Sequence, residues 1–284
     1  MGVISPLRYP GGKRKLFKYI KNLIEYNNLR GCVYVEPYAG GAGLALSLLF
    51  KDVVNNLILN DIDRSIYAFW YSVLYHTDEL CDLIWQTPVN MDQWYIQKEI
   101  QRNKYAHNLL SLGFSTLFLN RVNRSGIIKG GVIGGKNQSG KYKIDCRFNK
   151  KDLIHRIQKI ANYKSKIQVH NLDAIEFINI VVTNLPMNSF IFLDPPYYKK
   201  GPELYENHYK HNDHVKLAVE ITTKIKQPWI VTYDNVEIIR DLYKDYKQNE
   251  FDLNYTANLK YAGKEIMIYS NSVVPIDFKK RVFN

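Results

Sequence analysis

The stretch Val33-Tyr34-Val35-Glu36-Pro37-Tyr38-Ala39-Gly40-Gly41-Ala42-Gly43 decides the fold of this 284-residue chain. A run of strand-forming residues ends at Glu36, small residues occupy positions 39–43, and an apolar helical pattern follows. Small residues let the backbone approach a ligand, and a helix N-terminus favours an anionic group. The stretch predicts the first strand, turn and helix of an α/β domain with a ligand at the turn, although a plain tight turn uses the same residues.

The rest of the chain repeats this alternation of short apolar runs and helical periodicity. Strands are expected at 32–36, 57–61, 167–170, 189–194, 229–233 and 265–270, and helices at 14–27, 43–50, 63–76, 174–182, 215–226 and 236–242. This order predicts the α/β class, with a doubly wound, mostly parallel sheet. Ligands are expected beyond the carboxyl ends of its strands.

The alternation breaks between residues 77 and 150. Residues 91–119 read as helical, and a glycine-rich basic segment follows Asn120, expected as a hairpin or a mobile loop that becomes ordered on binding. We therefore expect one domain built from residues 1–76 and 151–284, interrupted by an insert at 77–150.

Positive charge is concentrated in one region of the chain. The net charge is +12, and residues 101–166 contain 15 lysines and arginines against two aspartates. A neutral body with one basic segment predicts a nucleic-acid partner, although a solvated surface is the alternative. The candidate contact residues in this segment are Arg121, Asn123, Arg124, Lys129, Lys136, Lys141 and Lys143.

The strongest motif for chemistry is Asp194-Pro195-Pro196-Tyr197, which follows the apolar run Phe190–Leu193. The two prolines stiffen the backbone after the strand, so that a carboxylate, a carbonyl and an aromatic ring lie close together. Asp194 and the Pro195 carbonyl suit the two hydrogens of an exocyclic amine, and Tyr197 suits stacking on a base. A rigid turn that closes a strand is the alternative.

Two further segments are candidate parts of the same site. Arg8-Tyr9-Pro10-Gly11-Gly12-Lys13 precedes a helix and reads as a lid or as a solvated glycine turn. Asn60-Asp61-Ile62-Asp63 follows a strand, where an acid can bind ribose hydroxyl groups; helix capping, the alternative role, suits Asp63 better.

Other patterns exclude several classes of protein. Neither a P-loop motif nor G-x-G-x-x-G occurs, which argues against a P-loop nucleotidase and weakens an NAD-dependent dehydrogenase. The longest uncharged apolar stretch, residues 39–50, is too short to span a bilayer, and no signal-peptide pattern is recognised, so we expect neither a membrane span nor a signal peptide. Cys32, Cys81 and Cys146 lie far apart without a C-x-x-C pair, which favours a reducing, cytoplasmic location. His208, His211 and His214 lack supporting carboxylates, so no metal site is expected, and a segment closing over a base is favoured.

These motifs, in this order, resemble the D12 class of adenine-N6 DNA methyltransferases, specifically its Dam-like α group. Y-P-G-G-K, E-P-Y-A-G-G-A-G, N-D-I and D-P-P-Y match the family over nearly the whole chain; weaker matches are Leu172-Asp173-Ala174 and Tyr261-Ala262-Gly263-Lys264-Glu265.

The resemblance implies a Rossmann-like methyltransferase sheet whose insert at 77–150, helical and then a hairpin, recognises DNA. It also implies transfer of a methyl group from S-adenosylmethionine, giving S-adenosylhomocysteine, to N6 of a flipped adenine. The implied catalytic residues are Asp194, Pro195, Pro196 and Tyr197. The implied cofactor-binding residues are Tyr9, Gly11, Gly12, Lys13, Glu36, Pro37, Tyr38, Gly40, Gly41, Gly43, Asp61, Ile62, Asp173 and Asp194.

Two departures limit what the resemblance implies. Tyr9 stands where the family often has Trp, which preserves stacking, and the segment Asn120–Gly126 diverges after its start, so that GATC specificity is not assumed. An RNA adenine or cytosine-N4 methyltransferase and a catalytically silent DNA-binding homologue remain alternatives. The expected partner is double-stranded DNA, a cognate restriction endonuclease is a candidate partner, and a monomer is expected.

Overall fold

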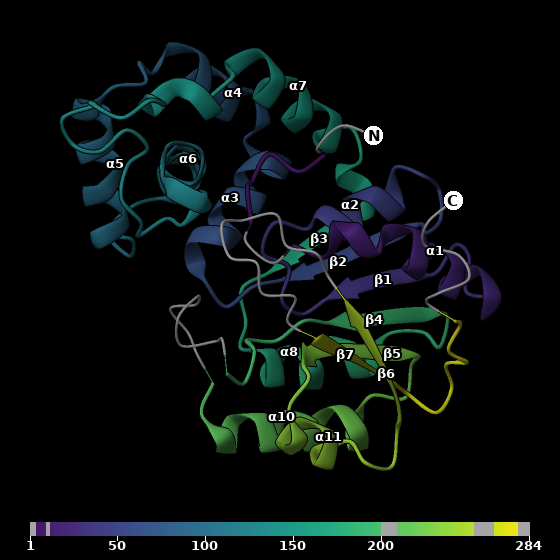
Figure 1. The fold of residues 1–284 in the computed structure, drawn as a ribbon. Helices are drawn as coiled ribbons and strands as arrows, with labels where there is room; N and C mark the ends of the chain where they lie inside the picture. Colours follow the sequence, from purple (N-terminus) through teal and green to yellow (C-terminus); the bar gives the residue numbers. More distant parts are fainter. Residues whose placement is uncertain (1–3, 10–11, 200–208, 253–263, 278–284) are drawn as a thin grey trace. The chain divides into compact units, whose positions relative to one another are not determined.

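The computed structural model describes residues 4–9, 12–199, 209–252 and 264–277. Its central element is a seven-stranded sheet with the order β3-β2-β1-β4-β5-β7-β6 (Figure 1). The strands are β1 (Val33–Glu36), β2 (Asn56–Asn60), β3 (Ile167–His170), β4 (Ser189–Leu193), β5 (Trp229–Asp234), β6 (Lys247–Asp252) and β7 (Lys264–Tyr269).

Parallel pairing dominates the middle of the sheet. β1 pairs in parallel with β2 on one side and with β4 on the other, and β4 pairs in parallel with β5. β7 pairs antiparallel with both β5 and β6. The predicted doubly wound, mostly parallel sheet is therefore confirmed, and its strand order reverses at the pair β1 and β4.

β6 is a strand that the sequence pattern did not predict. It lies at the end of the sheet, where β7 is its only neighbour in the strand order. Its sequence, Lys-Gln-Asn-Glu-Phe-Asp, contains a single apolar residue. An edge strand needs little apolar surface and benefits from charged side chains, so its composition resembles that of a loop.

Alternate residues of the strands face two different layers of helices. Val35, Ile191 and Val231 belong to a buried cluster that includes side chains of α8 (Ala174–Ile180) and α10 (His211–Lys224). On the opposite face lies α1 (Phe17–Tyr26), where the hydroxyl groups of Tyr19 and Tyr269 are 2.6 Å apart (Figure 1). This alternation is the period of two that a sheet covered on both faces requires.

The described contacts divide the chain into two compact units. Unit 1 comprises Met1–Gly12, Gly40–Leu46 and Asp61–Asn171; unit 2 comprises Lys13–Ala39, Ser47–Asn60 and Leu172–Asn284. The helices of unit 1 are α3 (Arg64–Tyr75), α4 (Thr77–Gln86), α5 (Met91–Arg102), α6 (Leu109–Val122) and α7 (Lys150–Ala161), whereas α11 (Glu237–Leu242) lies in unit 2 and α2 (Gly43–Leu49) spans the boundary.

Within unit 1, α6 is the central helix. Every residue from Leu112 to Val122 is buried, and α3, α4 and α5 all contact this helix. A helix enclosed on all sides needs no single apolar stripe, and the buried polar side chains of α6, such as Ser115, Thr116 and Asn120, are hydrogen bonded to neighbouring groups.

The predicted insert, residues 77–150, lies inside unit 1 and is more helical than expected. The helix expected at 91–119 is two helices, because Asn103 ends α5 and the Asn108 side chain caps the start of α6 by accepting the Ser111 N–H. α4 and α7 were not predicted. The expected hairpin is reduced to one antiparallel bridge between Asn123 and Val132.

We predict that Gly113→Ala destabilises unit 1. A Cβ atom at Gly113 would lie 2.5 Å from both the Ala68 carbonyl oxygen and the Ser72 hydroxyl on α3. Such overpacking costs about 1–3 kcal/mol, more than the roughly 1 kcal/mol that alanine gains over glycine in a helix. Urea unfolding measures the change, and Gly131→Ala, where a Cβ atom meets nothing within 4 Å, is the matched control. Equal stability of the two variants would contradict the prediction.

Candidate active site

The catalytic motif lies where the strand order of the sheet reverses. All five residues of β4 are buried, and Asp194 follows directly. Glu36 ends β1, the parallel neighbour of β4. The carboxyl ends of two such strands are the usual binding position in open α/β sheets. Asp194 and Glu36 therefore lie at the edge where the sequence predicts a ligand.

Asp194 is held by two side chains of unit 2. Its Oδ2 atom is 2.8 Å from Lys13 Nζ, and its Oδ1 atom accepts a hydrogen bond of 2.7 Å from the Thr232 hydroxyl. Lys13 is buried, and the Asp194 side chain is about one fifth exposed. The carboxylate therefore has a fixed orientation and an accessible side.

Tyr197 is fixed next to the same ion pair. Its side chain is 8% exposed, and its hydroxyl donates a hydrogen bond of 2.7 Å to Glu265 Oε2. The Lys13 ammonium group lies 4.9 Å from the centre of the Tyr197 ring. The motif thus presents a carboxylate and an aromatic ring that share one cation, a contact that the sequence analysis did not predict.

The sequence reasoning missed the three side chains that support this motif. Thr232 holds Asp194, Glu265 holds Tyr197, and Asp234 accepts the backbone N–H groups of Tyr198 and Lys199. One pattern could have identified Asp234, which ends the buried strand β5 at the edge where ligands bind. Glu265 belongs to the weak Tyr-Ala-Gly-Lys-Glu match, of which residues 261–263 lie outside the described residues.

The glycine turn of unit 1 is a close contact between backbone and an aromatic ring. Gly40 has a φ of +45°, and a Cβ atom there would lie 2.7 Å from two ring atoms of Tyr9. The Gly40 carbonyl oxygen accepts a hydrogen bond of 2.9 Å from Trp70 Nε1. The positive φ together with this close approach of the Tyr9 ring explains why glycine occupies position 40.

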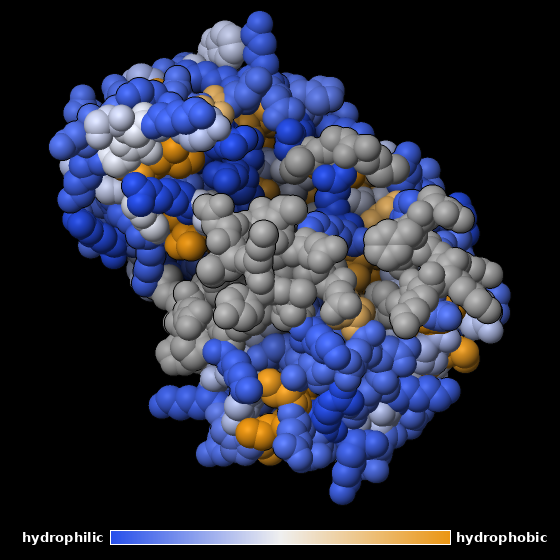
Figure 2. All heavy atoms as spheres, viewed as in Figure 1, coloured by the Kyte–Doolittle hydropathy of each residue, from blue (hydrophilic) through white to orange (hydrophobic). Residues whose placement is uncertain are grey.

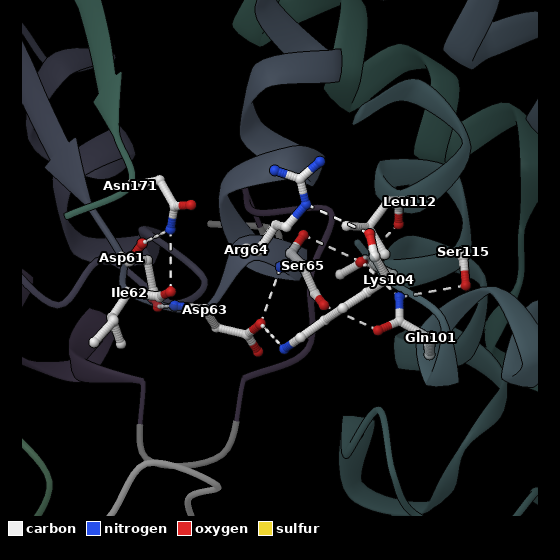
Figure 3. A network of polar contacts seen from close by, with 11 residues as sticks. Asp61, Ile62, Asp63, Arg64, Ser65, Gln101, Lys104, Leu112, Ser115 and Asn171 are labelled. Carbon is white, nitrogen blue, oxygen red and sulfur yellow. Dashed lines mark hydrogen bonds and ion pairs between the residues drawn. The ribbon is translucent and has the colours of Figure 1, made fainter. Parts of the chain in front are cut away.

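Asp61 stabilises the glycine turn and lies at the start of a polar network (Figure 3). Its Oδ2 atom accepts the Gly40 N–H at 2.9 Å, and its Oδ1 atom accepts the Asp63 N–H at 3.0 Å. Burial, reinforced by the nearby Asp63 charge, raises the pKa of Asp61 to about 7, against the lowering effect of the two hydrogen bonds. Asp63 caps α3 through Ser65 and pairs with Lys104 at 3.2 Å.

The remaining predicted cofactor residues occupy several environments. Pro37 is buried, and the Tyr38 hydroxyl is 3.0 Å from that of Tyr209. Ile62 is 47% exposed, and Asp173 caps α8 by accepting the Ile175 N–H. Gly12 and Gly43 are described, whereas Gly11 lies outside the described residues.

Neither a metal cluster nor a membrane span is found in the part of the chain that the structure describes. No group of three or more His, Cys, Asp or Glu side chains there could hold a metal ion, and no helix there is long and apolar enough to cross a bilayer. His211 contacts Tyr198 and His214 contacts Tyr233 through their Nδ1 atoms. His208 lies outside the described residues.

The predicted DNA-contact residues divide by exposure. Arg121 is 8% exposed and its Nε atom donates to the Arg147 carbonyl oxygen, while burial lowers its pKa to about 10. Asn123 is fully buried and bonds Trp94 and two backbone carbonyl groups. These two side chains face the interior of unit 1, so neither offers an exposed surface to DNA in this structure; a residue-type pattern carries no information on that burial. The exposed residues are Arg124, Lys129, Lys136, Lys141 and Lys143.

Comparison with known proteins defines the family. The model of the D12 class N6 adenine-specific DNA methyltransferases matches residues 9–257. The type II methyltransferase M.CviBI of Paramecium bursaria Chlorella virus NC1A is 21% identical over 255 residues, 89% of this chain and 91% of that protein. The type II methyltransferase M.MjaIII of Methanocaldococcus jannaschii is 21% identical over 203 residues, 67% of this chain and 68% of that protein. Modification methylase StsI of Streptococcus sanguinis is 26% identical over 205 residues, 68% of this chain and 28% of that protein.

The chain belongs to the D12 class N6 adenine-specific DNA methyltransferases, since the family match covers most of its length. It is an adenine-specific DNA methyltransferase, as its motif order predicted, and the family implies the use of S-adenosylmethionine. The roles of individual residues are taken up below as proposals.

We predict that Asp61 makes stability depend on pH. Its pKa is raised from 3.8 to about 7 in the folded state, so the folded state binds more protons between these values. The free energy of unfolding therefore falls as pH rises from about 4 to 7, by at most about 1.4 kcal/mol per pH unit from this group. Asp61→Asn should lose this slope. Urea unfolding of both proteins at pH 5 and pH 7 checks it, and parallel pH profiles would contradict it.

Proposed function

We propose that Asp194, Pro195, Pro196 and Tyr197 carry out methyl transfer to N6 of an adenine flipped out of duplex DNA. The observation that carries this proposal is the arrangement of Asp194 and Tyr197 at the reversal of strand order, with Lys13 between the carboxylate and the ring. This arrangement places a hydrogen-bond acceptor for the exocyclic amine next to an aromatic ring that can stack on the purine base.

For this reaction the main task of the protein is to align the methyl group with the target nitrogen. S-adenosylmethionine, when bound, supplies a methyl group already activated by a sulfonium centre. The Asp194 carboxylate and the Pro195 carbonyl oxygen accept hydrogen bonds from the two N6–H groups, which concentrates the nitrogen lone pair that otherwise delocalises into the ring. As the bond from N6 to the methyl group forms, the sulfonium–methyl bond breaks, S-adenosylhomocysteine is the leaving group, and N6 loses one proton to Asp194 or to water. Tyr197 stacks on the base and offsets part of the few kcal/mol that flipping costs.

The residues around the glycine turn suit the cofactor. Both carboxylate oxygens of Asp61 accept one backbone N–H each, and a carboxylate oxygen has a further lone pair for a ribose hydroxyl group. Tyr9 provides an aromatic face beside Gly40. We propose that these residues bind S-adenosylmethionine together with the other predicted cofactor residues, Gly11, Gly12, Lys13, Glu36, Pro37, Tyr38, Gly41, Gly43, Ile62, Asp173 and Asp194.

We propose that residues 77–150 contact the DNA. Their five exposed candidate cations are Arg124, Lys129, Lys136, Lys141 and Lys143. Hydrophilic side chains cover most of the visible surface around α5 and α6 in Figure 2. Phosphate contact is the commonest role for such residues, and Arg124 is the candidate for a base edge. Since the similar proteins include type II methyltransferases, a restriction endonuclease of the same specificity is the proposed partner.

The first experiment measures transfer of labelled methyl from S-adenosylmethionine to unmethylated genomic DNA, followed by single-molecule sequencing. N6-methyladenine at one recurring motif is expected, and it would also define the sequence that a partner endonuclease must cut. Cofactor binding without any incorporation into DNA would contradict the proposal and shift the substrate to RNA or the chain to a silent DNA binder.

Asp194→Ala is expected to abolish methyl transfer while DNA binding persists. The variant removes the acceptor for the N6 hydrogens but leaves the basic residues of unit 1 unchanged. A filter-binding titration and the labelled-methyl assay separate the two properties. Turnover at the wild-type rate would refute the assigned role of Asp194.

The variant Lys136→Ala/Lys141→Ala is expected to flatten the salt dependence of DNA binding. Each lost phosphate contact lowers the slope of log K against log salt by about 0.9 on B-DNA, so two contacts lower it by about 1.8. The control variant Lys224→Ala/Lys226→Ala removes two exposed lysines of unit 2 and should keep the wild-type slope. An unchanged slope for Lys136→Ala/Lys141→Ala would remove these lysines from the interface.

A further inference from the structure

Two buried carboxylates hold the three residues that follow the prolines of the catalytic motif. Glu265 Oε2 accepts the Tyr197 hydroxyl at 2.7 Å. Asp234 Oδ1 accepts the Tyr198 N–H and Asp234 Oδ2 accepts the Lys199 N–H, both at 2.8 Å. Each carboxylate thus bonds the segment that places the Tyr197 ring, one through a side chain and the other through the backbone.

The sheet brings these two acids together. Asp234 ends β5 and is the register partner of Glu265 in the antiparallel pair of β5 and β7. Because β7 runs antiparallel to β5, residues near its start lie at the same edge as the carboxyl ends of the parallel strands. The fold therefore places both acids beside the strand end that carries Asp194.

Burial of Asp234 and Glu265 carries a desolvation cost in free energy, because each carboxylate loses its contact with water. Asp234 is 6% exposed and Glu265 is 1% exposed. A buried carboxylate is tolerated when hydrogen-bond donors replace its water, and residues of the catalytic segment provide donors here. A packing role alone would be met by an apolar side chain at lower cost.

We propose that Asp234 and Glu265 are positioning residues for the target base, in that they fix the plane of the Tyr197 ring. Stacking depends on the orientation of the ring, and a tyrosine anchored only by its backbone can turn about two side-chain bonds. Glu265 holds the distal end of the ring at its hydroxyl group, and Asp234 fixes the backbone that follows Tyr197. This inference rests on the proposed stacking role of Tyr197.

The test compares single-turnover methyl transfer per active site, with active sites counted by titration with S-adenosylmethionine. Glu265→Leu fills the same space without an acceptor, Glu265→Gln keeps a neutral acceptor, and Tyr197→Phe removes only the donor. Glu237→Gln, an exposed acid on α11, is the matched control and should transfer at the wild-type rate.

We expect Glu265→Leu and Tyr197→Phe each to slow transfer about tenfold, the effect of one lost hydrogen bond worth about 1.4 kcal/mol. The double variant should be no slower than the slower single variant, because both remove the same bond. Glu265→Gln should lie between wild type and Glu265→Leu, Asp234→Asn should also slow transfer about tenfold, and the KM for S-adenosylmethionine should change less than twofold.

Base stacking gives an independent readout. A duplex with 2-aminopurine in place of the target adenine, in the motif found by sequencing, should fluoresce more strongly with Glu265→Leu than with wild type because the flipped base stacks less well. Wild-type rates per active site in Glu265→Leu, with only a lower melting temperature, would make Glu265 structural and overturn the inference.

If the double variant Glu265→Leu/Tyr197→Phe lost rate by the product of the two single losses, the two side chains would act independently, and the inference would also be overturned. If the wild-type protein transfers no methyl group, the proposed function itself is refuted, and this inference with it. Failure of the inference alone is recognised because the wild-type protein then remains active.

Discussion

The parallel pairing of β1 with β4 is the constraint on which the site depends. Val33, Tyr34 and Val35 pair with Ser189, Phe190 and Ile191, so both strands end at the same edge. That edge carries Glu36 from one strand and Asp194 from the other. Strand order reverses there, because β2 continues the sheet beyond β1 and β5 continues it beyond β4.

The carboxylates at this edge are hydrogen bonded by protein groups. Lys13 and the Thr232 hydroxyl satisfy Asp194, and donors of the catalytic segment satisfy Asp234 and Glu265. Each acid lies at or next to the end of a strand, from which its side chain reaches the catalytic segment. The strands are rigid, and the hydrogen bonds with Thr232, Asp234 and Glu265 hold the catalytic segment in a fixed position on them.

The sequence predicted those parts of the structure that depend on local pattern. Six of the seven strands, the position of Asp194 after β4 and the turn at Gly40 all follow from apolar runs, glycines and prolines. β6 escaped prediction because an edge strand needs few apolar residues. The burial of Arg121 and the support from Thr232, Asp234 and Glu265 depend on contacts between distant residues, on which no local pattern reports.

The pairing of β1 with β4 also determines when the molecule can complete its folding. Val33 pairs with Ser189, so residues 34–188 must be synthesised before the centre of the sheet can close. The helices of unit 1 lie within this interval and pack on one another through contacts much nearer in sequence. Because closing long loops is slow, the helices of unit 1 are expected to form their mutual contacts before β1 pairs with β4.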